Sequence, residues 1–225
     1  MAVGVNNFSK MSVFIQAYLY AISHLNDLFS ALGGHLLLVA VPLGVSLLVG
    51  LPLGLLSARS KAASTLLINS FSALRVIPSL AILFLAIPYF GLSFQSAAIA
   101  LTILAMPPIL ISTDVAFRSI EPAIREAAFG MGMTPGQVLR QVEIPLSLPV
   151  IIAGVKTATV EVIASATLAA FVGGGGLGTF ITLGFSLYDN GILLVGAIPV
   201  AFLALLAEVS LNALQRAVQP PMSRT

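Results

Sequence analysis

Cysteine and tryptophan are absent from this chain of 225 residues, and only 8% of its residues are charged. Without cysteine there is no disulfide, thiolate metal ligand or cysteine nucleophile. The two histidines, His24 and His35, are too few and too close to the N-terminus for a histidine-rich metal centre. Soluble domains usually carry about 25% charged side chains. The composition therefore excludes an ordinary globular enzyme, a nucleic-acid-binding protein and a disordered chain.

Hydrophobic residues, in contrast, make up 58% of the chain, and its mean hydropathy is +1.07. Four runs contain no Asp, Glu, Lys or Arg: 28–58, 76–113, 162–188 and 190–207. A helix crosses a bilayer with about 20 residues, so the run 76–113 is too long for one crossing. Pro88 to Gly91 is the natural break in this run, because proline and glycine favour turns. The runs are continuous rather than alternating, which favours helices over strands. We predict an all-α, polytopic membrane helix bundle with about five spanning helices, at residues 35–57, 62–88, 94–116, 146–171 and 191–213.

Basic residues indicate the orientation of this bundle, because lysine and arginine gather in loops on the cytoplasmic side. If the N-terminus is outside, seven of them fall on the cytoplasmic side, and the other side has only Lys10. The seven are Arg59, Lys61, Arg118, Arg125, Arg140, Arg216 and Arg224. The sequence therefore predicts a multi-pass protein with its N-terminus outside and its C-terminus in the cytoplasm.

Residues 11–30 form a pattern apart from these spans. A short apolar stretch after Lys10 superficially resembles a signal peptide, but apolar and polar residues lie on opposite faces, which is typical of an amphipathic helix at the membrane surface. The apolar face has Phe14, Tyr18, Ala21, Leu25 and Leu28, and the polar face has Ser12, Gln16, Ser23 and Asp27. We predict an interfacial segment over 1–34, a membrane domain over 35–213 and a cytoplasmic tail over 214–225. A sixth span or a cleaved signal is the alternative for residues 11–30.

The segment 119–145, between the third and fourth spans, is amphipathic and moderately charged. Pro122 suits the first position of a short helix, because its missing N–H is not needed there. Gly130 or Gly132 can end this helix. The sequence therefore predicts one short helix followed by a glycine turn.

A second short helix is predicted after that turn. Thr134 suits its N-cap, and Gln137 can bond back to the cap in a capping box. Pro145 is expected to stop this helix just before the fourth span. Two short helices joined by a glycine turn would form a rigid projection suited to a partner protein, and a solvated connector is the alternative interpretation.

The same segment contains a spaced motif: Glu126-Ala127-Ala128, then Gly132, then Val142, Ile144 and Pro145. It resembles the cytoplasmic motif of permease subunits of bacterial ABC importers, in which Glu-Ala-Ala and Gly precede Ile, any residue, Leu and Pro. Val142 and Ile144 stand where that family usually has Ile and Leu. The resemblance implies a type I ABC importer permease fold over about residues 35–213. It also implies that the motif residues couple the chain to a separate ATPase.

Further stretches narrow the resemblance to importers of osmoprotectants such as glycine betaine, choline and carnitine. These stretches are 77–81, 143–155, 166–170, 173–178 and 196–199. Methionine importers are similar in size and also have a glycine-rich turn after the fourth span. An arginine at the position of Arg75, just before Ile77-Pro78, resembles the methionine importers and departs from the pattern expected of osmoprotectant importers. A methionine or amino-acid importer permease is therefore the alternative.

The family resemblance also implies an assembly in a bacterial inner membrane. A second permease copy, identical or paralogous, would complete the pathway, and an external solute-binding protein would deliver the solute. Two cytoplasmic ABC ATPase subunits would bind ATP and Mg²⁺, whereas this chain would bind no cofactor or metal and would have no catalytic residue. Membrane lipid is an expected partner and nucleic acid is not. The competing class is a secondary transporter driven by an ion gradient, with Glu161 as its coupling carboxylate.

Ionisable residues inside the predicted spans are costly in a bilayer and are usually paired or functional. Arg75 and Glu161 lie at similar predicted depths, about 20 Å from the cytoplasmic ends of their spans, which predicts an ion pair. The alternative is that Glu161 faces the pathway and attracts a cationic amine. Lys156 is shallower and is expected to extend to the cytoplasmic surface.

Glycine and proline mark the predicted gate and hinge. The run 173–178 has no lysine of a phosphate-binding loop, so it does not indicate a nucleotide site. The family resemblance implies an external gate at Gly173, Gly174, Gly175, Gly176 and Gly178, and the alternative is a tight turn in which the backbone packs closely. Pro78 is a predicted hinge inside the second span, and the alternative is a kink that serves close helix packing. Neighbouring helices can satisfy the carbonyls that a proline frees.

Overall fold

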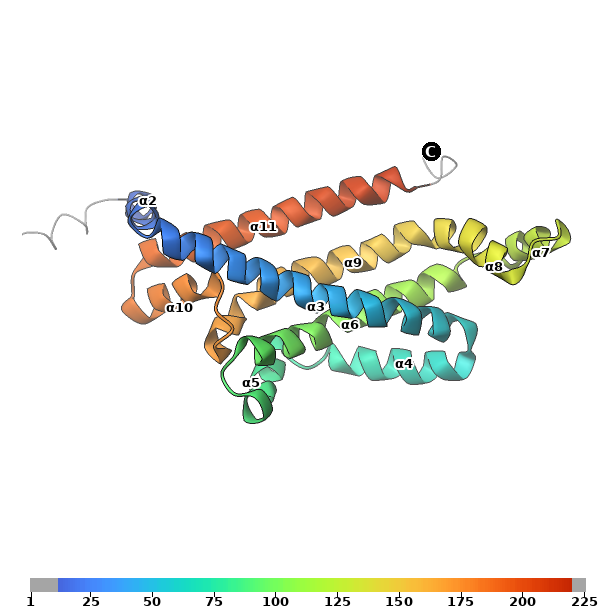
Figure 1. The fold of residues 1–225 in the computed structure, drawn as a ribbon, viewed down its shortest axis with the longest axis horizontal. Helices are drawn as coiled ribbons and strands as arrows, with labels where there is room; N and C mark the ends of the chain where they lie inside the picture. Colours follow the sequence, from blue (N-terminus) through green and yellow to red (C-terminus); the bar gives the residue numbers. More distant parts are fainter. Residues whose placement is uncertain (1–11, 220–225) are drawn as a thin grey trace, which may run out of the picture. The chain divides into compact units, whose positions relative to one another are not determined.

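The computed structural model describes residues 12–219, which form helices joined by short turns, with no strand among them (Figure 1). Within this range four helices are long and apolar enough to cross a membrane, and a bent pair of shorter helices makes a fifth if it counts as one span. The four are α3 (Leu25–Arg59), α6 (Phe94–Arg118), α9 (Ile144–Ala166), which continues from the segment before it, and α11 (Asn190–Ala217). The predicted all-α bundle is confirmed.

The shorter elements lie before and between these four helices along the chain. They are α2 (Val13–Ser23), α4 (Lys61–Leu74), α5 (Ser79–Phe90), α7 (Pro122–Gly130), α8 (Pro135–Val138), the π-helical turn η1 (Leu139–Glu143), the 3₁₀ turn η2 (Leu168–Val172) and α10 (Gly178–Leu187). The chain divides into two compact units. The first contains the described residues up to Val41, with Ser79–Leu101 and Ile163–Leu205. The second contains Pro42–Pro78, Thr102–Val162 and the described residues from Leu206.

In the first unit, α2 packs against α10 and the start of α11. Ala17 of α2 lies in a buried cluster with Phe180 of α10 and with Ile192 and Val195 of α11. Tyr20 meets Phe180 edge to face, with the ring centroids 6.4 Å apart. These apolar and aromatic contacts hold α2 against the other two helices.

In the second unit, small residues bring the long helices close together. A Cβ built at Gly154 of α9 would lie 2.3 Å from Cβ of Ser112 in α6, so this position has no room for a larger side chain. Ser46 of α3 donates a hydrogen bond of 3.0 Å to the carbonyl of Thr102 in α6. Membrane helices associate through such close packing and interhelical hydrogen bonds, because lipid supplies no hydrophobic drive between them.

The N-terminal boundaries differ from the prediction. The first span begins at Leu25 rather than at 35, and Gly33 and Gly34 do not interrupt α3. The predicted domain boundary between residues 34 and 35 therefore falls inside a helix. The preceding α2 has 11 residues, and at 1.5 Å per residue it is about 16 Å long, too short to cross a bilayer. The part of the predicted interfacial segment before residue 12, and the end of the predicted tail from residue 220, lie outside the described residues.

Two of the predicted spans are also wrong in their bounds. The span expected over 62–88 is broken, because α4 and α5 are bent by 94° relative to each other. Pro78 lies in this break; it has no N–H for a helical bond and disfavours the helical conformation of the residue before it. The span expected over 146–171 is α9, which begins at Ile144 and ends at Ala166. Helix α10 was not predicted, since ten apolar residues are too few for a span.

Candidate functional site

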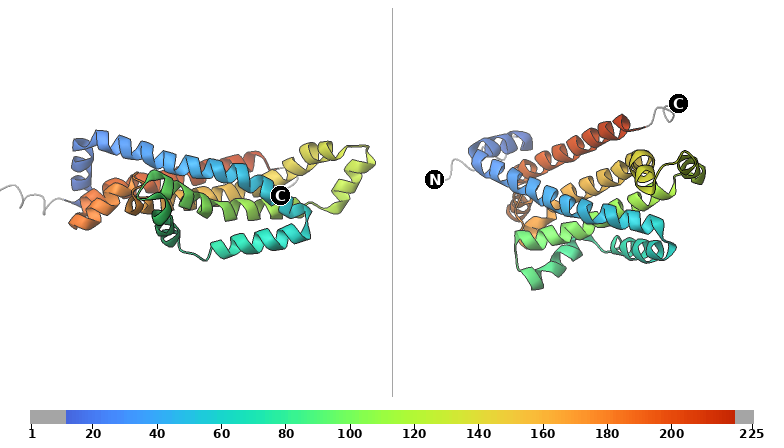
Figure 2. Two further views of the ribbon diagram at one scale, coloured as in Figure 1. Left: turned by 60° about the horizontal axis from the view of Figure 1, so that its bottom comes forward. Right: turned by 45° about the vertical axis from the view of Figure 1, so that its right-hand side comes forward.

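The α7–α8 hairpin contains most of the predicted coupling residues, and Figure 2 shows it, in yellow-green and yellow, extending past the end of α6. Pro122 is the first residue of α7 and Gly130 is the last, as the sequence predicted. Gly132 follows in the turn with φ +82°. L side chains rarely adopt this conformation and glycine adopts it freely, so the turn requires glycine at this position.

A capping box begins α8, as predicted. The Thr134 N–H donates a hydrogen bond of 2.8 Å to Oε1 of Gln137, and the Gln137 N–H donates one of 3.4 Å to Oγ1 of Thr134. The prediction that Pro145 stops this helix is wrong, because the chain continues through η1 into α9 and Pro145 is the second residue of α9. We attribute this to the π-helical turn, which replaces the i→i−4 bonding that a proline ring would disrupt.

Most of the motif residues lie at the surface of the chain. Ala128 is buried and Val142 is partly buried, whereas the remaining five are exposed: Glu126, Ala127, Gly132, Ile144 and Pro145. Three large apolar side chains of the same hairpin are also exposed: Ile124 at 37%, Phe129 at 49% and Met131 at 74%. The hairpin thus presents apolar side chains and an acidic residue together.

A buried carboxylate lies at the base of the hairpin. The Glu143 side chain is only 1% exposed, and it accepts hydrogen bonds from Arg59 and Arg125. Arg125 Nε lies 2.7 Å from Glu143 Oε1, and Arg59 Nη1 lies 3.1 Å from the same oxygen, while Arg59 Nη2 bonds the other oxygen. Arg125 also donates a 2.6 Å bond to the carbonyl of Phe117. We call Arg59, Glu143 and Arg125 the Glu143 cluster.

A second buried acid lies close by in the same unit. Asp114 accepts a 2.7 Å hydrogen bond from Ser57 Oγ and bonds of 3.0 Å from Nε of Arg118. Arg118 Nη2 donates a 2.6 Å bond to the carbonyl of Ser57. This group ties the last turn of α3 to the last turn of α6. Sequence reasoning missed both acids, although an acidic residue directly beside an apolar run and near several arginines is a signal that could have found them.

Arg75 and Glu161, the predicted intramembrane pair, are brought together. Arg75 Nη2 lies 3.8 Å from Glu161 Oε1, and the two side chains are 48% and 38% exposed in the isolated chain. Arg75 follows α4 directly, at the break that contains Pro78. The distance is within the range of an ion pair.

Lys156 does not extend alone to a surface as predicted. Its Nζ donates a 2.8 Å hydrogen bond to Oδ1 of Asn212 and lies 3.3 Å from Oε1 of Glu208. Both partners are on α11, so the lysine links α9 to α11. Because Glu208 and Asn212 lie close enough to stabilise the ammonium group, Lys156 does not need to reach water.

Four of the predicted gate glycines, Gly173 to Gly176, lie in the loop between η2 and α10, and Gly178 is the first residue of α10. Gly173, Gly175 and Gly176 have φ between +75° and +76°. A Cβ built at Gly178 would lie 2.1 Å from the carbonyl oxygen of Thr167, so only glycine allows this approach. The loop is therefore a tightly packed connection, and its role as a gate stays a prediction.

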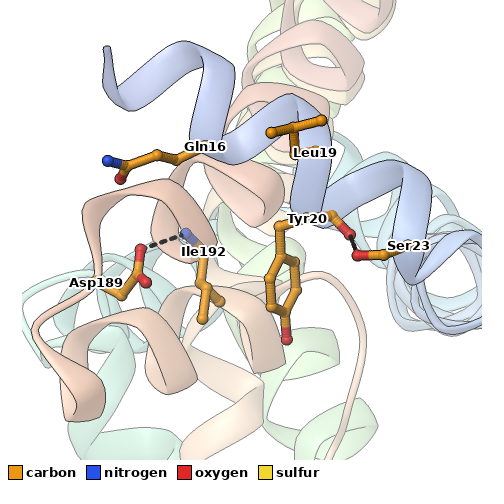
Figure 3. Close-up of a pocket in the computed structure, with 6 residues that line it drawn as sticks. All are labelled: Gln16, Leu19, Tyr20, Ser23, Asp189 and Ile192. Atoms are coloured by element: carbon orange, nitrogen blue, oxygen red, sulfur yellow. Dashed lines mark hydrogen bonds between the residues drawn. The ribbon is translucent and has the colours of Figure 1, made fainter. Parts of the chain in front are cut away.

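A cavity of about 480 Å³ lies between α2 and the start of α11 (Figure 3). It is lined by Gln16, Leu19, Tyr20, Ser23, Asp189 and Ile192. Asp189 Oδ1 accepts hydrogen bonds of 2.8 Å and 3.1 Å from the N–H groups of Gly191 and Ile192. This carboxylate therefore acts as the N-terminal cap of α11.

Comparison with known families identifies the chain. The family described as "binding-protein-dependent transport system inner membrane component" matches residues 50–224. The chain belongs to this family. It is the membrane permease subunit of an ABC importer, as the motif in segment 119–145 predicted.

Curated relatives cover most of the chain. It is 44% identical to the carnitine transport permease protein OpuCB of Listeria monocytogenes, over 83% of this chain and 85% of that protein. It is 40% identical to the choline transport system permease protein OpuBB of Bacillus subtilis, over 81% and 83%. It is 37% identical to the osmoprotectant import permease protein OsmW of Salmonella typhimurium, over 89% and 96%.

Solved structures give the fold. The chain is similar to a chain of the MetNI methionine ABC transporter in inward-facing conformations, with a TM-score of 0.76 over 88% of this chain and 99% of that chain. It is less similar to a chain of an amino acid ABC transporter with histidines, with a TM-score of 0.60. The identities are 24% and 19%, so these likenesses show the type I importer permease fold alone.

Proposed function

We propose that this permease subunit carries a small quaternary amine osmoprotectant, such as carnitine, choline or glycine betaine. The observation that carries the proposal is the sequence similarity of this chain to a carnitine permease and a choline permease, which extends over more than four fifths of the chain. Affinity and most of the selectivity would reside in an external solute-binding protein. This chain would then need no aromatic cage of its own.

The α7–α8 hairpin is the proposed docking element for a separate ATPase. Exposed apolar side chains beside charged ones mark protein-binding surfaces. Phe129 and Met131 are such side chains, and Glu126 is exposed on the same hairpin. Two ATPase subunits would each bind ATP and Mg²⁺, and their closure would move the hairpin of each permease copy.

The proposed assembly contains a second permease copy, identical or paralogous, because five spans are few for a gated pathway. The proposed orientation has the N-terminus outside and the C-terminus in the cytoplasm, which puts the hairpin on the side of the ATPase. It is supported by the basic residues of the loops. Lys10 and Arg224, which also enter that charge count, lie outside the described residues.

Arg75 and Glu161 are proposed as an intramembrane ion pair at the break between α4 and α5. Their 3.8 Å separation supports the pair, since an unpaired charge is costly in a bilayer. Pro78 would act as the hinge of this break, and the glycine loop 173–178 would form the external gate. The alternative role of Glu161, attracting a cationic solute, is tested by the same variants as the pair.

The test is uptake of radiolabelled choline by liposomes that contain this chain, its partner permease and its ATPase, with the binding protein outside. We expect uptake that requires ATP and the binding protein, is stopped by vanadate, and is competed by carnitine or glycine betaine but not by methionine. Competition by methionine would favour the amino-acid importer alternative. Uptake driven by an ion gradient without the ATPase would favour the secondary transporter.

The docking proposal has a matched pair of variants. Glu126→Arg reverses the charge of the exposed motif residue, and we expect it to abolish ATP-driven uptake and weaken association with the ATPase. Glu121→Arg makes the same change at an exposed position of the same hairpin outside the motif, and we expect it to retain uptake. Equal behaviour of the two variants would contradict a docking role for the motif.

A further inference from the structure

The Glu143 cluster joins three elements of the second unit through one buried carboxylate, and Arg125 connects them to a fourth. Glu143 is the last residue of η1, Arg125 lies in α7, and Arg59 is the last residue of α3. Arg125 also reaches the carbonyl of Phe117, in the last turn of α6. Helix α7 of the hairpin and η1, which directly follows α8, are thus bonded to the ends of two spanning helices.

The geometry of these bonds is directional. Arg59 uses two guanidinium nitrogens on the two oxygens of Glu143, a forked arrangement that fixes the relative orientation of the two groups. Arg125 adds a third bond and also satisfies a carbonyl at the C-terminus of α6, where helix carbonyls have no partner within the helix. A lysine has the charge of arginine but not its planar fork.

We propose that Glu143, Arg59 and Arg125 are positioning residues that transmit movement of the α7–α8 hairpin to α3 and α6. The Glu143 cluster makes the hairpin and the two helix ends move as one body. Without it the hairpin would still dock and the ATPase would still turn over, but the spanning helices would not follow. The inference rests on the proposed docking of the hairpin on an ATPase.

Three variants test this link in reconstituted liposomes. They are Glu143→Gln, which removes the charge, Arg59→Lys, which keeps the charge but loses the fork, and Arg125→Lys, which does the same for the third bond. Association with the ATPase is measured by copurification, ATP hydrolysis by phosphate release, and coupling by the solute imported per ATP. Lys61→Gln is the control, because Lys61 is an exposed cation two residues from Arg59.

We expect copurification as in wild type, ATP hydrolysis within about two-fold, and solute imported per ATP lowered about ten-fold in Glu143→Gln. The KM for the solute stays unchanged while the maximal uptake rate falls, and Glu143→Asp recovers part of the coupling. Lys61→Gln keeps the wild-type ratio. Wild-type coupling in Glu143→Gln and in both lysine variants would overturn the inference.

A cross-linking experiment covers the case in which Glu143→Gln does not assemble. The chain has no cysteine, so Arg59→Cys and Glu143→Cys can be combined and bridged by a short, reducible thiol-specific linker. Coupling that returns with the linker and disappears on reduction supports the link, and coupling indifferent to the linker overturns it. Loss of ATPase association in the wild-type chain would instead refute the proposed docking, so the two failures are distinguishable.

Discussion

Replacing Glu161 by glutamine removes the carboxylate that lies 3.8 Å from the Arg75 guanidinium. At this distance two unit charges attract by about 4 kcal/mol at an effective dielectric constant of about 20. Exposed pairs in water couple by only about 0.2–1 kcal/mol. These side chains are 48% and 38% exposed in the isolated chain, and the proposed position inside the membrane would leave less water around them than at a protein surface. We therefore expect a coupling free energy of about 2 kcal/mol, between the two limits.

The assay is a double-mutant cycle with Glu161→Gln, Arg75→Gln and the double variant, measured by thermal unfolding of the purified protein. For a chain of this size 1 kcal/mol corresponds to about 2–4 °C in Tm, so each single change should lower Tm by about 4–8 °C. The double variant should recover part of the loss, because it leaves neither charge without a partner. Lys156 and Glu208, 3.3 Å apart, provide a second cycle for comparison.

Losses that add within about 0.5 kcal/mol would refute the pair, since residues that do not interact contribute independently. Choline uptake separates the pair from the pathway role. If Glu161 faces the pathway, Glu161→Gln lowers uptake of the cation while Tm stays near that of wild type. Unchanged uptake would remove the pathway role.

Two further predictions concern glycine packing and capping. Gly178→Ala should lower Tm through a steric cost of about 1–3 kcal/mol, because its Cβ would meet the Thr167 carbonyl oxygen at 2.1 Å. In the control Gly44→Ala the new Cβ meets nothing within 4 Å, and alanine is favoured over glycine inside a helix, so Tm should not fall. A fall of equal size in both variants would contradict the packing argument. Thr134→Ala should destabilise the start of α8 by about 1 kcal/mol, seen as faster amide hydrogen exchange at Gln137, and Thr134→Ser should restore protection; unchanged exchange in Thr134→Ala would show that the cap contributes nothing.

Local signals of the hairpin could be predicted from the sequence. The proline at the start of α7, the glycine turn and the capping box all depend on residues within four positions of one another. Their geometry is decided by the backbone preferences of a few residues. The spanning helices could be predicted for the same reason, since a charge-free run indicates a span without knowledge of its neighbours.

Proline shows why the bounds of the helices were harder to predict. Pro78 was placed inside a helix and lies in a 94° break, whereas Pro145 was expected to end a helix and lies within one. Pro107 and Pro108 leave α6 unbroken. The outcome depends on the turn before each proline, such as the π-helical turn before Pro145, and on neighbouring helices that satisfy the freed carbonyls. Neither is visible in the local sequence.

The two buried acids were missed because all but one of their partners are distant in the chain, the exception being Arg118, four residues from Asp114. Glu143 is 84 residues from Arg59 and 18 from Arg125, and Asp114 is 57 residues from Ser57. No helical or strand spacing relates such positions. Only the packing of the ends of α3 and α6 with the hairpin brings them together.

The arginines at the ends of the spans consequently have two roles that a count of loop charges does not separate. Arg59, Arg118 and Arg125 were counted as cytoplasmic charges that orient the protein, yet each donates to a buried carboxylate. A charge bonded in this way contributes less to attraction by anionic lipid, because its field is largely cancelled by the acid. Lys61 and Arg140 are exposed, so neutralising these two should disturb orientation in the membrane more than neutralising Arg59 and Arg125, which should mainly reduce coupling. The test compares the membrane orientation of two double variants, Arg59→Gln/Arg125→Gln and Lys61→Gln/Arg140→Gln. Inverted insertion of the first but not of the second would contradict this division of roles.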